Sequence, residues 1–95
     1  MIILLSEAAI ADLSRLRSFL EEKDSTTGTK VVAKLRSAIN SLHQFPSLGR
    51  PALLPDLREL IVPFGRSAYI VRYKYVSGDS ELVILRVWHG RELRD

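Results

Sequence analysis

Cysteine is absent from the 95-residue chain, so neither disulfides nor thiolate metal sites can hold its fold. No apolar run approaches the roughly 18–20 residues of a membrane span. The first residues also lack the basic segment and the longer apolar stretch of a signal peptide. We therefore expect a cytoplasmic protein that does not contact a membrane.

A large excess of charge of one sign is also missing. The net charge is +3 and is spread thinly along the chain, so it indicates no particular partner by itself. The two histidines, His43 and His89, lie far apart in a chain without cysteine, which makes a metal site or another cofactor unexpected. His43 falls in the last turn of a predicted helix, where it complements the helix dipole and needs no other role.

What is present is an ordinary globular balance, with 46% hydrophobic and 26% charged residues in a length suited to one domain over residues 1–95. The apolar run 2–5 predicts a short buried strand. Ser6 can cap a helix that ends near Lys23. The buried face of this helix is predicted to carry Ala9, Leu13, Leu16 and Leu20, and Ile10 and Phe19 would widen it. The opposite face of the helix would carry Asp12, Arg15 and Glu22.

A second helix is predicted to begin within residues 24–29 and to stop at Phe45-Pro46, because proline cannot donate the helical hydrogen bond. Its apolar positions are Val32, Leu35, Ile39 and Leu42. The connection between the two helices is short, so we expect an antiparallel helical hairpin. The region 47–55 has the composition of a loop.

Three strands are predicted after this loop, over residues 57–62, 68–76 and 81–89, joined by short turns into a meander. Alternation places one set toward the helices: Tyr69, Val71, Tyr73, Tyr75, Val83, Leu85 and Val87. The opposite face would carry Arg72, Lys74, Arg86 and Trp88. The predicted fold is α+β, in the order β-α-α-β-β-β, with the helical hairpin on one face of a small, mainly antiparallel sheet.

Several segments, taken in order, resemble the RelE/ParE toxins, nearer the ParE or plasmid-stabilisation branch. They are Gly49-Arg50, the run 57–60 (LREL), the run 69–73 (YIVRY) and the run 84–91 (ILRVWHGR). The resemblance implies the toxin of a type II toxin–antitoxin system, neutralised in a hetero-oligomer by a cognate antitoxin encoded alongside. The final strand is similar to ParE sequences, and Ile70 stands where RelE-like sequences often carry arginine.

By that resemblance the favoured activity is inhibition of DNA gyrase, without enzymatic chemistry. The alternative is a ribosome-dependent mRNA endoribonuclease, in which His89 would transfer protons and Arg72, Arg86 and Arg91 would supply charge, supported by a tyrosine or Glu92. A third possibility is a non-toxic module that only binds a partner. In each case we expect the antitoxin to use a groove beside the helical hairpin and a basic surface comprising Arg58, Arg72, Lys74, Arg86, Trp88 and Arg91.

Overall fold

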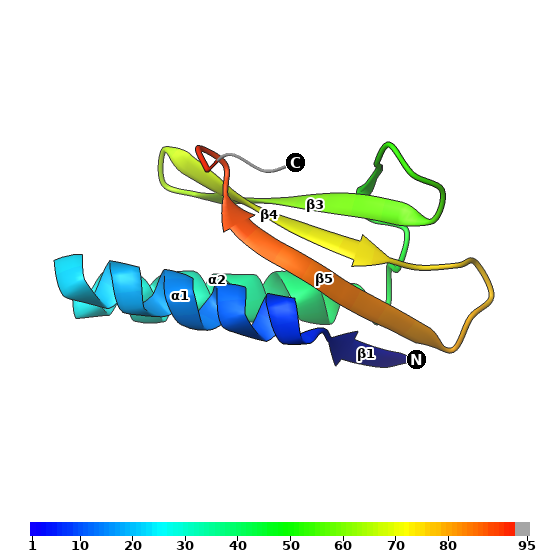
Figure 1. Ribbon diagram of the computed structural model, residues 1–95, viewed down its shortest axis with the longest axis horizontal. Helices are drawn as coiled ribbons and strands as arrows, with labels where there is room; N and C mark the ends of the chain where they lie inside the picture. The colour runs from blue at the N-terminus through cyan, green and yellow to red at the C-terminus, as the bar shows by residue number, and fades with distance from the viewer. Residues whose placement is uncertain (93–95) are drawn as a thin grey trace.

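A helical hairpin lies against one face of a twisted sheet, and no helix or strand of residues 1–92 covers the other face, here called the open face (Figure 1). This computed structural model describes residues 1–92. Its elements are β1 (Ile2–Leu5), α1 (Glu7–Lys23), α2 (Ser25–Ser41), β2 (Arg50–Pro51), β3 (Leu57–Phe64), β4 (Ser67–Lys74) and β5 (Glu81–His89). The predicted α+β architecture is confirmed, with one additional short strand, β2.

Two side chains cap the residues where the helices begin, and α2 ends at Ser41, four residues before the predicted stop at Phe45-Pro46. The Ser6 hydroxyl accepts a hydrogen bond from the Ala9 N–H at 3.0 Å and caps α1. Asp24 is the single residue between the helices, and its carboxylate accepts from the Thr26 N–H at 3.0 Å and from the Thr27 hydroxyl at 2.9 Å. The Thr27 hydroxyl and then the Thr26 amide lower the pKa of Asp24. Neither helix in residues 1–92 is long and apolar enough to cross a membrane.

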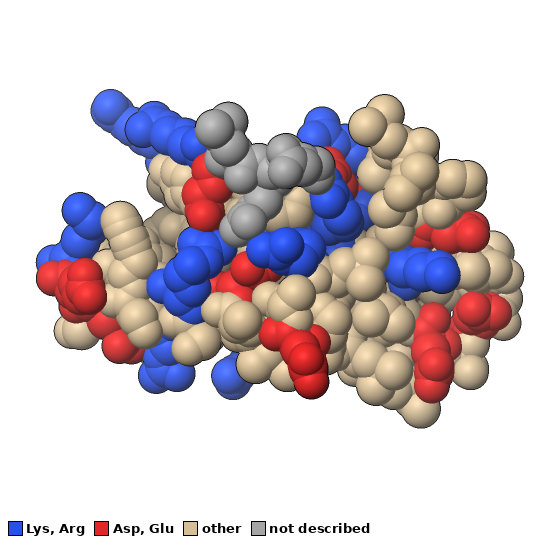
Figure 2. Space-filling model, in the orientation of Figure 1, with Lys and Arg blue, Asp and Glu red and all other residues tan. Residues whose placement is uncertain are grey.

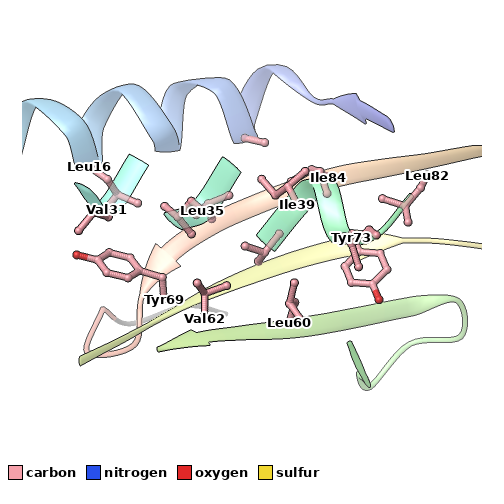
Figure 3. Close-up of a cluster of buried hydrophobic side chains, with 14 residues drawn as sticks. Leu16, Val31, Leu35, Ile39, Leu60, Val62, Tyr69, Tyr73, Leu82 and Ile84 are labelled. Atoms are coloured by element: carbon pink, nitrogen blue, oxygen red, sulfur yellow. The ribbon is translucent and has the colours of Figure 1, made fainter. Parts of the chain in front are cut away.

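The core lies between the helical hairpin and the sheet (Figure 3). From the helices it receives Leu16, Val31, Leu35 and Ile39, and from the sheet Leu60, Val62, Tyr69, Tyr73, Leu82 and Ile84. Leu35 and Ile39 therefore occupy the predicted buried face of α2. Ile10 and Phe19 do not widen the stripe of α1 as predicted, because both side chains are exposed.

Within residues 1–92 the strands follow the order β1-β5-β4-β3-β2. The pairs from β5 to β2 are antiparallel, whereas β1 runs parallel to β5. Residues 2–5 do form a strand, as predicted, but the prediction that this strand is buried is wrong, because β1 is an edge strand and Ile2, Leu4 and Leu5 are exposed. The segment 50–51, predicted as loop, instead pairs with β3 at Glu59 and Arg58.

A β-bulge corrects the predicted faces of the last strand. Arg72 pairs with Arg86 and the next residue, Tyr73, pairs with Ile84, so Leu85 is the extra residue of β5. The bulge reverses the alternation, and the buried residues become Leu82, Ile84 and Val87 rather than Val83, Leu85 and Val87. A strict two-residue period cannot anticipate this change.

Candidate functional site

The open face of the sheet carries an arginine that is already paired. The Arg72 guanidinium donates to the Glu59 carboxylate on β3, with Nε and Nη2 at 3.1 and 2.9 Å from Oε2. It also lies 4.8 Å from the centre of the Trp88 ring, in a cation–π contact. Trp88 is only 6% exposed. Trp88, which was predicted to bind the antitoxin on this face, is therefore largely covered.

Arg86 is engaged by a buried carboxylate of α1. The Asp12 carboxylate, in a residue that is 4% exposed, accepts from Arg86 Nε at 2.8 Å and Nη2 at 3.1 Å, and from the Val87 N–H at 2.9 Å. The hydrogen bonds to Asp12, and then the charge of this carboxylate, raise the pKa of Arg86 above its ordinary value. A buried carboxylate is tolerated when donors surround it. The prediction that Asp12 faces away from the core is wrong, and this residue ties α1 to β5.

Arg58 stabilises the loop that follows α2. Its Nη1 atom donates to the Gly49 carbonyl at 2.7 Å and to the Ser47 carbonyl at 3.2 Å. The buried Tyr73 hydroxyl accepts from the Gly49 N–H and donates to the Pro46 carbonyl, both at 2.8 Å. A Cβ atom on Gly49 would come within 2.7 Å of the Tyr73 ring. These contacts hold the loop in place, so Arg58 has a structural role.

Apart from these arginines, a second cluster of polar side chains, Tyr69, His89 and Glu92, lies at the end of β5. The rings of His89 and Tyr69 meet edge to face at 5.2 Å, and His89 Nδ1 accepts from the Arg91 N–H at 3.1 Å. Glu92 accepts from the His89 N–H at 2.7 Å and from Arg15 at 2.8 Å. Burial, and then the charge of Glu92, raise the pKa of Tyr69.

This second cluster borders an apolar groove of about 600 Å³ between the helical hairpin and the adjacent end of the sheet. Its apolar lining comes from Leu16, Phe19, Leu20 and Phe64. Arg15, Lys23 and Arg91 line it with positive charge, and Glu92 is held by Arg15. The groove can accept an apolar segment that also carries negative charge.

The four residues predicted for RNA cleavage are divided between these two places. His89 and Arg91 line the groove. Arg72 and Arg86 lie opposite each other in neighbouring strands, and each is paired with a carboxylate. Within residues 1–92 no three His, Cys, Asp or Glu side chains are placed to hold a metal ion. The groove brings Tyr69, His89 and Glu92 together with Arg91, but not with the other two predicted arginines.

Comparison with known proteins assigns the family. The model of the ParE toxins of type II toxin–antitoxin systems (parDE) matches residues 3–94. The chain belongs to this family. The toxin RelE1 of Caulobacter vibrioides is 38% identical to it over 92 residues, covering 97% of this chain and 96% of that toxin. RelE2 of the same organism is 33% identical over 85 residues, covering 90% of each chain.

The fold agrees with this assignment. A chain from the chromosomal ParDE toxin–antitoxin system of P. aeruginosa superposes with a TM-score of 0.78, covering 94% of this chain and 95% of that one at 22% identity. The protein is thus a type II toxin of the RelE/ParE superfamily. Several of the segments that carried the resemblance are structural in this toxin, since Gly49, Arg58 and Tyr73 together fix one loop.

Proposed function

We propose that this toxin inhibits DNA gyrase without acting as an enzyme and that a cognate antitoxin neutralises it in a hetero-oligomeric complex. The observation that carries the proposal is the separation of the four candidate nuclease residues, two of which are already paired with carboxylates. The likeness of the final strand to ParE sequences and the match to the ParE family model support it further.

Cleavage of RNA needs a base, an acid and cations that reach the same phosphate. Arg72 would have to leave Glu59, and Arg86 would have to leave Asp12, before either could bind phosphate. Freeing Arg86 would also leave the Asp12 carboxylate buried with fewer donors, which is costly. Binding to a protein target requires none of these changes.

The proposal is tested by two assays on one purified preparation. We expect the toxin to inhibit supercoiling by DNA gyrase and to leave ribosome-bound mRNA intact. Cleavage of mRNA with unaffected supercoiling would move the protein to the nuclease class. Normal growth after expression without the antitoxin, together with no effect in either assay, would support the non-toxic binding module.

The endoribonuclease is the second candidate because Tyr69, His89, Arg91 and Glu92 do meet at one end of the sheet. The substitution His89→Asn separates the two functions. Its side-chain oxygen can still accept a hydrogen bond, but it cannot transfer protons at neutral pH. A gyrase inhibitor should retain most of its effect in this variant, whereas a nuclease that uses His89 should lose mRNA cleavage.

The antitoxin is proposed to dock in the apolar groove rather than on the centre of the open face. Of the six residues predicted to bind it, Arg58, Arg72 and Arg86 are held by other groups and Trp88 is buried. Arg91, in contrast, lines the groove and is exposed. Lys74 is also exposed, at the end of β4. We therefore expect an acidic amphipathic segment that buries apolar residues against Phe19 and Phe64.

Substitutions on the groove test this docking mode. Phe19→Ser should weaken antitoxin binding, mainly by faster dissociation, because it removes buried apolar contact. Lys23→Glu combined with Arg91→Glu should slow association and reduce its dependence on salt. Lys34→Glu, at an exposed position of α2 outside the groove, is the matched control. If the groove variants bind the antitoxin as the control does, the antitoxin uses another surface.

A further inference from the structure

An ion pair within the toxin lies at the border of the apolar groove. Arg15 Nη1, on α1, donates to Glu92 Oε2, just after β5, at 2.8 Å, and both residues line the groove. The side chain of Arg15 is 43% exposed and that of Glu92 is 30% exposed, so solvent reaches the pair. Figure 2 shows acidic and basic side chains adjoining one another where the end of β5 meets α1. The toxin thus places a carboxylate of its own on one of the cations of the groove.

Glu92 is also held by the turn to which it belongs. Its Oε1 atom accepts from the His89 N–H at 2.7 Å, and its own N–H donates to the His89 carbonyl at 2.9 Å. The two carboxylate oxygens therefore have different tasks, since Oε1 binds the turn and Oε2 binds Arg15. The contact with Arg15 can be exchanged while the hydrogen bond to His89 stays in place.

The ion pair between Arg15 and Glu92 is easily replaced by an equivalent one. The other carboxylate near Arg15 is that of Asp12, 3.6 Å from Arg15 Nη2, and it already accepts from Arg86 and from the Val87 N–H. Solvent-exposed ion pairs are weak, and one such pair changes an equilibrium by about two- to fivefold. A carboxylate from a bound partner can therefore take the place of Glu92 on Arg15 at small cost.

The apolar lining of the groove defines the partner that can make this exchange. Phe19 and Phe64 offer surface to apolar side chains, and the Lys23 ammonium lies 5.1 Å from the centre of the Phe19 ring. A segment that buries apolar side chains here is held beside Arg15, where an acidic residue of the same segment reaches the guanidinium. An acidic residue that is placed otherwise meets the charge of Glu92 and is repelled.

We infer that Glu92 is an internal competitor for Arg15, and that the antitoxin binds the apolar groove with a carboxylate that replaces Glu92 on Arg15. The inference rests on the proposed docking of the antitoxin in this groove, and it is independent of the target of the toxin. Because the bound antitoxin gains one ion pair while the toxin loses another, the net gain from Arg15 is small. Glu92 therefore keeps the affinity for the antitoxin below the value that the same groove would reach without it.

The test measures the affinity of the full-length toxin for the purified antitoxin encoded alongside it, at low and at high salt. Glu92→Gln removes the charge, while its amide oxygen can still accept from the His89 N–H. Glu81→Gln is the matched control, because Glu81 is exposed at the start of β5 and does not line the groove. At low salt Glu92→Gln should bind the antitoxin about two- to fivefold more tightly than the control does. The gain should shrink at high salt, and the melting temperatures of the two variants should agree.

Arg15→Gln separates competition from simple repulsion between Glu92 and an acidic segment. Without Arg15 the two carboxylates have no cation to compete for, so adding Glu92→Gln to this variant should leave the affinity nearly unchanged. An equal gain with and without Arg15 would show that Glu92 only repels the antitoxin, and the inference would be wrong. Unchanged or weaker binding by Glu92→Gln in the presence of Arg15 would also overturn it, because Glu92 would then be neutral or would support the binding surface.

Phe19→Ser distinguishes the failure of this inference from the failure of the proposed docking mode. If Phe19→Ser weakens binding and Glu92→Gln does not strengthen it, the antitoxin occupies the groove without competing with Glu92, and the inference alone fails. If both variants bind as the unmodified toxin does, the antitoxin uses another surface, and the docking mode and the inference fail together. Both outcomes can be read whether the toxin acts on gyrase or on mRNA.

Discussion

Removing one hydroxyl group from the core should destabilise the toxin strongly. Tyr73 is fully buried, and its hydroxyl joins the loop after α2 to the sheet through the Gly49 N–H and the Pro46 carbonyl. Tyr73→Phe preserves the ring but leaves both backbone groups without this partner. Each lost hydrogen bond costs about 0.5–1.5 kcal/mol, and a buried group left unsatisfied costs about 1–3 kcal/mol. Because water can reach the Pro46 carbonyl more easily than the Gly49 N–H, we expect a total of about 2–4 kcal/mol.

Urea unfolding followed by circular dichroism measures this loss, provided that the slope against denaturant stays unchanged. In a domain of this size about 1 kcal/mol lowers the melting temperature by roughly 4–8 °C. Tyr75→Phe is the matched control, because within residues 1–92 the Tyr75 hydroxyl accepts a single exposed hydrogen bond, from the Gly78 N–H at 3.3 Å. A Tyr73→Phe variant as stable as the Tyr75→Phe variant would refute the role assigned to the buried hydroxyl.

Three further predictions concern stability, each measured by the same unfolding assay. Leu35→Ala should cost about 2–5 kcal/mol, because it opens a cavity between α2 and the sheet, and a change below 1 kcal/mol would contradict this packing. Asp12→Ala should lower the free energy of unfolding by about 3 kcal/mol or more, since the Val87 N–H and Arg86 lose their acceptor. Asp12→Asn should lower it less, because the amide oxygen can still accept a hydrogen bond. Burial raises the pKa of the Tyr73 hydroxyl in the folded protein. The contribution of this hydroxyl to the free energy of unfolding is therefore complete below about pH 10, and it falls above that pH because the unfolded chain ionises first. Tyr73→Phe should therefore lose less stability than the parent between pH 9 and 11, and equal losses would assign the alkaline effect to other groups.

The candidate site was only partly predictable from the sequence. Arg72, Arg86 and Trp88 could be placed on one sheet face by alternation, and they do lie on neighbouring strands. Their partners could not be found in the same way. Asp12 lies three residues after Ala9 and four before Leu16, which is the spacing of the buried stripe, so a signal for its burial was present. An acidic residue is nevertheless expected to be exposed, because it is buried only when donors from another element surround it, and the sequence does not show those donors.

By itself the sequence determined the class of the fold, the limits of α1, the burial of Leu35 and Ile39 on α2 and the order of the three long strands. It did not determine the end of α2, which lies at Ser41 rather than at Phe45-Pro46. The features that it determined depend on local periodicity and on capping residues, both of which act within a few residues along the chain. The tertiary structure alone decided three things: the bulge at Leu85, the edge position of β1 and the pairing of the arginines. Each depends on contacts between residues far apart in the sequence, such as Asp12 with Arg86. Long-range pairing of this kind selects which charged groups are neutralised, and thereby which surfaces stay available to a partner.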